Sequence, residues 1–218
     1  AVTREVVQEK TGSDRGKLVP TASGKVLVQE RHGNTFVAAW NGSCTAAGGD
    51  DIERLALIDS LTDLYNSRTF LKEIKDELKR AKRYKRPVSL CMITVDNFGD
   101  VSRSYGALAA DGVLKLVGGV VKSAIRDVDI AARFSAEEFA IILPETNAQG
   151  AAIVAERIRN RVLNHEVTHN WNNLKVSASV GVAAFPTHAR EHDELIQRTI
   201  QAMELAEQRG GDQVVTSI

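Results

Sequence analysis

The stretch RDVDIAARFSAEEFAIIL, residues 126–143, constrains the fold of this chain more than any other. Ile130–Phe134 and Phe139–Leu143 are mainly apolar runs of strand length, and Ser135–Glu138 interrupts the apolar pattern between them. Two such runs around a tight connection predict a β-hairpin. Its tip would carry two glutamates. An arginine and an aspartate three residues apart, Arg126 and Asp129, precede its first strand.

Strands and helices are predicted to alternate around this hairpin. Val88–Val95 is a continuous apolar run of strand length, so it should be a buried central strand. Apolar residues at helical spacing predict helices over residues 67–84, 108–125, 148–163 and 192–209. Further strands are expected over residues 176–185 and 213–215. This alternation, together with the hairpin, predicts a layered α/β domain.

The first 50 residues form a separate part of the sequence. Gly24–Trp40 alternates on either side of His32–Asn34, which predicts a second hairpin, and residues 41–49 are rich in small residues typical of a linker. One hairpin cannot form a stable core alone. We therefore predict an appendage, or the remnant of an upstream domain, over residues 1–50 and the α/β domain over residues 51–218. The chain opens with Ala-Val, so we expect a fragment of a longer protein.

The charge and cysteine content favour a cytoplasmic protein. Lys+Arg and Asp+Glu both number 28, so nothing in the charge balance indicates DNA as a partner. No apolar run approaches the length of a membrane span. Cys44 and Cys91 lack metal-ligand spacing and suit a reducing compartment, with Cys91 predicted to lie in the core.

Two motifs together resemble the GGDEF family of bacterial signalling domains, the diguanylate cyclases. Residues 59–66, DSLTDLYN, look like the family's DxLTxLxN, and residues 135–139, SAEEF, look like its signature with Ser-Ala in place of the paired glycines. The Arg-x-x-Asp of residues 126–129 lies five residues upstream of the turn, where the family carries its product-binding inhibitory site. The resemblance covers residues 51–218. It implies a nucleotidyl-cyclase-like fold, with a central mixed sheet flanked by helices and a hairpin carrying the degenerate signature.

The resemblance also implies a metal-dependent active site, and several of its positions are altered here. The family holds its metal with a carboxylate at the end of the first strand and with the first acid of the hairpin tip. The strand-end position is Thr94, whose neutral hydroxyl is a weak ligand for a hard cation. The tip acids are retained as Glu137, which we interpret as a solvated acid, and Glu138, which is assigned no role. Ser135 and Ala136 carry Cβ atoms where paired glycines admit a phosphate.

Further positions that touch nucleotide in the family differ as well. A lysine, a guanine-reading asparagine, and a lysine and an arginine of the last helix are replaced by Gly99, Ser102, Glu207 and Gly211, whereas a second guanine contact is retained as Asp111. Because the metal ligand, the base contact and the phosphate cations are altered together, we expect this domain not to be an enzyme. We also expect no metal or other cofactor, and poor binding of GTP.

The product-binding half of the resemblance is intact. A guanidinium fork suits phosphate oxygens or the O6/N7 edge of guanine, and a carboxylate can accept from guanine N1 and N2. Arg126 and Asp129 supply these groups, and Arg157 matches the further arginine of the family's site when counted from the turn. The alternative is a surface ion pair between Arg126 and Asp129 that contributes little, with Arg157 simply solvated.

The sequence therefore favours a catalytically inactive GGDEF domain that senses cyclic di-GMP at its RxxD site. Two alternatives stay open: a weak diguanylate cyclase that uses Glu137, and a dimerisation or interaction module that binds no nucleotide. Because cyclic di-GMP has two like faces, a homodimer or a ligand-bridged dimer is among the expected partners.

Overall fold

The computed structural model describes residues 16–21, 24–31, 34–40, 57–169 and 172–218. The chain divides into two compact units, Ala1–Gly48 and Gly49–Ile218. In the first unit, β1 (Gly16–Thr21), β2 (Gly24–Arg31) and β3 (Asn34–Trp40) form an antiparallel sheet in that order. The hairpin predicted over Gly24–Trp40 is therefore confirmed as β2–β3. The predicted linker and Cys44 lie outside the described residues.

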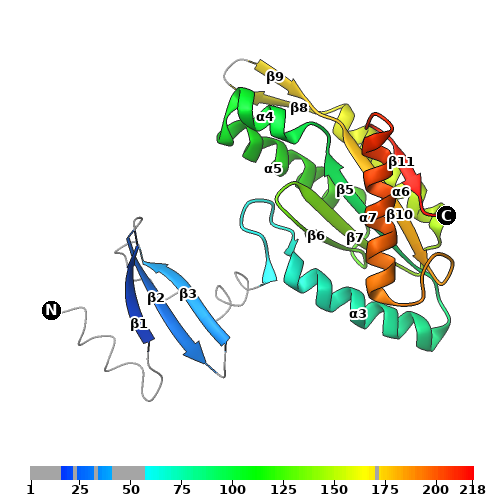
Figure 1. Cartoon of the computed structure of the whole chain (residues 1–218), viewed down its shortest axis with the longest axis horizontal. Coiled ribbons are helices and arrows are strands. Elements are labelled where there is room, and N and C mark those ends of the chain that lie inside the picture. The colour runs from blue at the N-terminus through cyan, green and yellow to red at the C-terminus, as the bar shows by residue number, and fades with distance from the viewer. Residues whose placement is uncertain (1–15, 22–23, 32–33, 41–56, 170–171) are drawn as a thin grey trace. The chain divides into compact units, whose positions relative to one another are not determined.

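A six-stranded mixed sheet forms the centre of the second unit (Figure 1), which confirms the predicted fold. The strand order is β11-β10-β5-β7-β6-β4, and the four central strands pair antiparallel, whereas each edge strand is parallel to its neighbour. In chain order the strands are β4 (Tyr65–Asn66), β5 (Val88–Val95), β6 (Ile130–Arg133), β7 (Glu138–Pro144), β10 (Ala178–Phe185) and β11 (Val214–Thr216).

Helices cover both faces of this sheet (Figure 1). Helices α5 (Ala107–Ala124) and α6 (Ala148–Leu163) pack on one face, and α3 (Ser67–Tyr84) and α7 (His192–Gln208) pack on the other. Each helix buries an apolar stripe at helical spacing, as the sequence predicts. On α3 this stripe contains Phe70, Ile74, Leu78 and Ala81.

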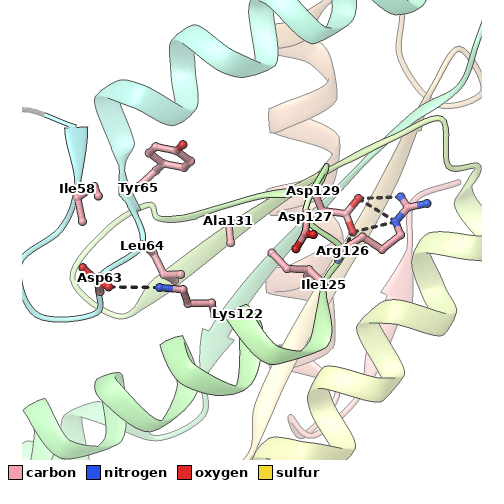
Figure 2. Close-up of a pocket in the computed structure, with 10 residues that line it drawn as sticks. All are labelled: Ile58, Asp63, Leu64, Tyr65, Lys122, Ile125, Arg126, Asp127, Asp129 and Ala131. Carbon is pink, nitrogen blue, oxygen red and sulfur yellow. Dashed lines mark hydrogen bonds and ion pairs between the residues drawn. The ribbon is translucent and has the colours of Figure 1, made fainter. Parts of the chain in front are cut away.

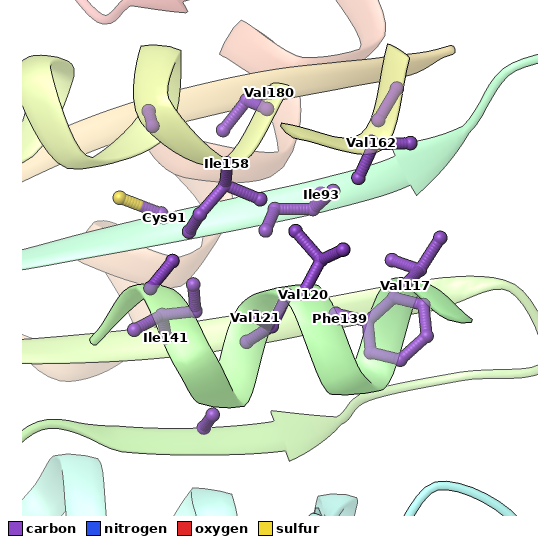
Figure 3. Close-up of a cluster of buried hydrophobic side chains, with 14 of the residues drawn as sticks. Cys91, Ile93, Val117, Val120, Val121, Phe139, Ile141, Ile158, Val162 and Val180 are labelled. Atoms are coloured by element: carbon purple, nitrogen blue, oxygen red, sulfur yellow. The ribbon is translucent and has the colours of Figure 1, made fainter. Parts of the chain in front are cut away.

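The larger core cluster lies between the sheet and the α5–α6 layer (Figure 3). Alternate residues of a strand point to the same face, so Cys91 and Ile93 of β5 face this layer together with Phe139 and Ile141 of β7. Burial raises the pKa of the Cys91 thiol to about 12, with a smaller effect from the charge of Asp129. Cys91 is therefore a neutral core residue, as predicted.

The structure contains two features that apolar periodicity does not predict. Helix α4 (Phe98–Tyr105) precedes α5 and has no fully buried residue, and only its Phe98 and Val101 pack, partly buried, against the core. Strands β8 (Glu166–His169) and β9 (Asn172–Lys175) form a separate hairpin of four-residue strands. Among the helices that the structure describes, none has the length and apolar character that crossing a membrane requires.

Candidate functional site

Arg126 and Asp129 form a compact turn directly after α5 (Figure 2). The Asp129 backbone amide donates to the Arg126 carbonyl at 3.0 Å, and the Arg126 backbone amide donates to Asp129 Oδ2 at 2.8 Å. The two side chains also pair: Arg126 Nη2 donates to Asp129 Oδ1 at 2.7 Å, and Nε donates to Oδ2 at 3.1 Å. The carboxylate thus fixes both the turn and the fork of the guanidinium.

The two members of this pair differ in exposure. The Asp129 side chain is 1% exposed, whereas the Arg126 side chain is 57% exposed. The pKa of Arg126 is raised above its ordinary value, chiefly because of its hydrogen bond to Asp129. If both residues contacted a ligand directly, both side chains would be expected to be exposed. The Asp129 side chain is buried instead, because its carboxylate is turned inward onto Arg126. In this arrangement Asp129 positions Arg126.

A second loop holds the same guanidinium. Arg126 Nη2 donates to Thr146 Oγ1 at 3.0 Å and to the Pro144 carbonyl at 3.3 Å, just beyond the end of β7. Nη1 of Arg126 makes no hydrogen bond within the part of the chain that the structure describes. Asp129, Thr146 and Pro144 therefore hold Nε and Nη2 of Arg126, and Nη1 is the nitrogen that is available to a ligand.

Arg157 lies beside this turn, although 31 residues separate it from Arg126 in the sequence. It is exposed on α6, and its Nη2 donates to the carbonyl of Ala124, the last residue of α5, at 2.5 Å. The structure thus brings Arg126, Asp129 and Arg157 to the same end of α5. Sequence analysis did not identify Thr146 or Ala124 as partners, because their contacts depend on how β7 and α6 pack.

A pocket of about 300 Å³ adjoins the Arg126–Asp129 pair. Figure 2 shows this pair at one end and the ion pair between Lys122 and Asp63 at the other, with Nζ and Oδ2 at 3.3 Å. The lining residues are Ile58, Asp63, Leu64, Tyr65, Lys122, Ile125, Arg126, Asp127, Asp129 and Ala131. Five of these residues are apolar or aromatic and five are charged, and charged groups lie at both ends.

The hairpin tip lies at the opposite end of β7 from Arg126's partners. Ser135 and Ala136 are exposed, and Glu137 and Glu138 are half-buried. Buried Thr94 lies opposite Glu138 in the β5–β7 ladder. Three other positions of the family's active site lie, in contrast, on exposed helix surface: Gly99 and Ser102 on α4, and Asp111 on α5.

Arg133 connects the hairpin tip to the DSLTDLYN motif. Its Nη2 donates to the Ala136 carbonyl at 2.6 Å, and its Nη1 lies 3.3 Å from Asp59 Oδ2. Asp59 also accepts from the backbone amide and the hydroxyl of Thr62, at 2.9 and 2.7 Å. Arg133 therefore links the two motifs that carry the family resemblance.

Asp96, two residues after Thr94, has a structural role. Its carboxylate accepts from the hydroxyls of Ser177 and Ser179, both at 2.6 Å, and from the backbone amide of Asp212 at 2.9 Å. Gly211, at φ +75°, packs so closely against this carboxylate that a Cβ added to it would lie 3.0 Å from Cγ of Asp96. Within residues 57–169 and 172–218, no group of three or more His, Cys, Asp or Glu side chains could hold a metal ion.

Glu207 is exposed near the end of α7, where it faces other acids. The pKa of Glu207 is raised from 4.5 by partial burial and then by the charges of Asp96, Glu137, Glu138 and Glu204. Because the pKa of Glu207 is higher in the folded protein than in the unfolded chain, protonated Glu207 stabilises the fold at pH values below the unfolded-state pKa. This stabilisation is lost as the pH rises through the folded-state pKa. Ionised Glu207 therefore destabilises the fold at neutral pH.

We expect Glu207→Gln to raise the free energy of unfolding at pH about 7 by roughly 0.5 kcal/mol, a small value because the site is solvent-screened. The gain in stability should disappear at a pH of about 4, where the Glu207 carboxyl group of the parent is largely protonated. Urea unfolding at both pH values measures this difference. Glu204→Gln, on the same helix, should give a smaller change, since Glu204 contributes least to the shift of Glu207. A gain that is equal at both pH values would contradict this explanation.

Comparison with known proteins supports the fold and identifies relatives. Diguanylate cyclase A of Treponema denticola is 32% identical over 149 residues, which are 68% of this chain and 40% of that protein. The diguanylate cyclase SiaD of Pseudomonas aeruginosa, solved with its activator SiaC, is 31% identical with a TM-score of 0.72 over 76% of this chain and 64% of that chain. The GGDEF domain of DgcB from Caulobacter crescentus, solved with c-di-GMP, has a TM-score of 0.70 over 74% of this chain and 93% of that one, but at 24% identity it shows the fold alone.

These relatives correct one prediction. The expectation that this domain is not an enzyme is wrong, because its relatives at 31 and 32% identity are named diguanylate cyclases. The residues at Thr94, Glu207 and Gly211 are departures from a motif, and a departure from a motif does not establish loss of turnover. This chain also spans only 40% of the Treponema protein, so that protein's activity as a whole concerns a longer chain.

The family itself is shown by the extent of the match. The sequence profile described as "Diguanylate cyclase, GGDEF domain" matches residues 56–213, which is nearly the whole α/β unit. The matched segment includes the DSLTDLYN motif, the hairpin and the helices on both faces of the sheet. The chain therefore belongs to the GGDEF family, the diguanylate cyclases.

Proposed function

We propose that this GGDEF domain binds cyclic di-GMP at the face formed by Arg126, Asp129 and Arg157. The observation that carries the proposal is the Arg126–Asp129 pair, in which a carboxylate that is 1% exposed holds a guanidinium that is 57% exposed. A buried acid that orients an exposed arginine suits a site that must present a positive charge and a free N–H group to an anion.

The chemistry of the ligand fits this arrangement. Each phosphodiester of cyclic di-GMP carries one negative charge, and guanine presents O6 and N7 as acceptors. Nη1 of Arg126 can donate to either, and exposed Arg157 adds a second cation at the same end of α5. Because Asp129 and Thr146 already fix the Arg126 fork, little side-chain entropy is lost on binding.

Two further observations support the proposal. The adjoining pocket of about 300 Å³ combines apolar side chains such as Leu64 and Ile125 with charged ones, and it could accept a planar base beside Arg126. Relatives of this chain are named diguanylate cyclases, whose product is this dinucleotide. A product site and an active site can coexist in one domain, so the proposal concerns binding and is independent of turnover. The two like faces of the ligand also allow it to bridge two chains into a dimer.

Calorimetric titration of the 218-residue chain with cyclic di-GMP, beside GTP with Mg²⁺, tests the proposal. We expect cyclic di-GMP to bind more tightly than GTP, because two arginines face it and the hairpin end is acidic. If the titration detects no binding of cyclic di-GMP, the hypothesis of an interaction module that binds no nucleotide would be favoured instead. Equal affinities, or a preference for GTP that Asp111→Ala abolishes, would move the binding site to the hairpin end.

Arg157→Ala should weaken cyclic di-GMP binding by about tenfold, because one charge-assisted contact is lost. Arg161→Ala provides a matched control. Arg161 is one turn further along α6, and its Nη1 donates to the Ser123 carbonyl at 3.1 Å, much as Arg157 contacts Ala124. Both variants therefore lose an α6–α5 contact, but Arg157 contacts Ala124, which is nearer to Arg126 in the chain than Ser123 is. Equal affinity loss in the two variants would show that helix packing, and not ligand contact, causes the effect.

A further inference from the structure

The turn after β7 places an acidic residue next in the chain to the two oxygens that hold Arg126. Glu145 lies between Pro144 and Thr146, the two residues whose oxygens accept from Arg126 Nη2. Its carboxylate forms an ion pair with Nη1 of Arg86, a residue 59 positions away in the sequence. Both side chains are largely solvent-exposed, at 57% for Arg86 and 58% for Glu145.

The fold fixes the position of this pair. In the β5–β7 ladder Val88 lies opposite Pro144, so the residues just before β5 lie beside those just after β7. Arg86 is held at the end of α3, where its backbone amide donates to the Ala81 carbonyl at 3.1 Å. The Arg86–Glu145 pair therefore results from strand register and does not depend on a flexible loop.

Glu145 also has a constrained backbone. Its φ is +51°, a region that a residue with a Cβ rarely occupies. The neighbouring residues hold it there, because Ser89 Oγ donates to the Thr146 carbonyl at 2.7 Å and Thr146 Oγ1 donates to the Pro144 carbonyl at 2.9 Å. The carboxylate can thus leave the site by side-chain rotation while the turn stays in place.

We infer that Glu145 is a built-in anionic competitor for a ligand phosphate at this site, and that Arg86 is a further phosphate-binding residue that Glu145 occupies in the free protein. The inference rests on the proposed function, since it concerns the affinity of the same face for cyclic di-GMP. It adds one cation and one opposing anion to the set identified by sequence.

Charge and exposure support this assignment. An exposed ion pair of this kind contributes little to stability, so a phosphate can replace the carboxylate without unfolding the turn. The charge of Glu145 acts on Arg126 as well, as the smallest of the influences that raise the pKa of that guanidinium. A phosphate that approaches Arg126 therefore meets the field of Glu145, and removal of Glu145 frees Arg86 at the same time.

The test is calorimetric titration of cyclic di-GMP into the parent, Glu145→Gln, Arg126→Ala and the double variant Arg86→Ala/Glu145→Gln. Glu145→Gln keeps the shape of the side chain and should tighten binding about threefold to tenfold, as expected for removal of one exposed like charge. The double variant should lose most of that gain. Thermal melting checks folding, and Glu145→Asn repeats the test with a side chain that tolerates positive φ.

Glu191→Gln is the matched control. Glu191 forms an exposed ion pair with Lys82 of α3 at 2.6 Å, so this variant also removes one carboxylate from an exposed ion pair, but Glu191 is not next in the chain to residues that contact Arg126. We expect its affinity to match the parent within about twofold, because exposed charges are strongly screened.

The outcomes separate this inference from the proposed function. The parent could bind cyclic di-GMP and Arg126→Ala could weaken that binding, while neither Glu145→Gln nor Glu145→Asn tightens it. This result would overturn the role of Glu145 as a competitor and leave the proposed site intact. Equal tightening in Glu191→Gln would reduce the effect to net charge and also overturn it. Absence of parent binding would overturn the proposed function, and the inference with it.

Discussion

Replacement of Arg126 by alanine should weaken cyclic di-GMP binding by about tenfold to a hundredfold, the consequence of losing a charge-assisted contact of about 1.5–3 kcal/mol. The effect should exceed that of Arg157→Ala, because Arg126 is the better preorganised of the two. Its Nε and Nη2 groups are held by Asp129, and Nη2 is also held by Thr146, so that Nη1 is kept in place for a ligand. Titration of both variants at one salt concentration measures the difference, and added salt should weaken binding by the parent.

Two variants make this result specific. Arg126→Lys keeps the charge but cannot present a fork, so its affinity should lie between those of the parent and Arg126→Ala. Arg103→Ala removes an arginine from another i,i+3 pair, Arg103–Asp100 on α4, whose side chains are exposed by 79 and 65%. That control should bind like the parent.

Truncation of Arg126 has a second consequence, which the experiment must separate from lost ligand contact. It leaves the buried Asp129 carboxylate without its cation, and an unpaired buried charge destabilises a fold. Titrations should therefore be made well below the melting temperature of each variant. If Arg126→Ala is folded and binds as well as the parent, the RxxD match is a coincidence and the interaction-module hypothesis replaces the proposed site.

Local sequence signals were enough to predict most helices and strands. The predicted bounds of α3 and α6 agree with the structure because both helices begin after an asparagine that caps them. Asn66 Oδ1 accepts from the Thr69 amide at 2.9 Å, and Asn147 Oδ1 accepts from the Gly150 amide at 2.8 Å. The central strand β5 is equally clear, because all eight of its residues are buried and only Ser89 and Thr94 interrupt its apolar run.

The geometry of the candidate site could be predicted only in part. The register from the hairpin turn indicates that Arg126, Asp129 and Arg157 belong together, but it does not show that Asp129 is buried. That burial results from packing at the end of α5, where the carboxylate already has an arginine fork to accept from. The Arg86–Glu145 pair is also invisible in the sequence, because it depends on the β5–β7 register.

The enzyme prediction failed for a different reason. The prediction was based on differences from the family motif at Thr94, Glu207 and Gly211, and such differences do not by themselves show that turnover is lost. Gly211 shows the weakness of that step, because its glycine serves to pack against the Asp96 carboxylate at positive φ. A residue can thus differ from the motif for a structural reason that letters alone do not show.

Gly181→Ala should destabilise the α/β unit by about 3 kcal/mol or more, at the upper end of the range for overpacked cores. Gly181 lies in the centre of β10 where α7 crosses the sheet. An added Cβ would lie 2.2 Å from the Thr199 carbonyl oxygen and 2.3 Å from the Met203 amide nitrogen. Both are backbone atoms of a helix, so they cannot move aside as a side-chain end can, and the whole of α7 must shift.

Gly119→Ala is the matched control for this prediction, because it makes the same chemical change on an exposed face of α5 where nothing lies within 4 Å of the new Cβ. Alanine is the better helix former, so this variant should stabilise the fold by about 0.5–1 kcal/mol. Urea unfolding followed by far-ultraviolet circular dichroism measures both variants against the parent. Since α7 also carries Glu207 to the hairpin end, a Gly181→Ala protein with parental stability would mean that α7 moves freely on the sheet. The pH effect expected for Glu207→Gln would then lose its structural basis.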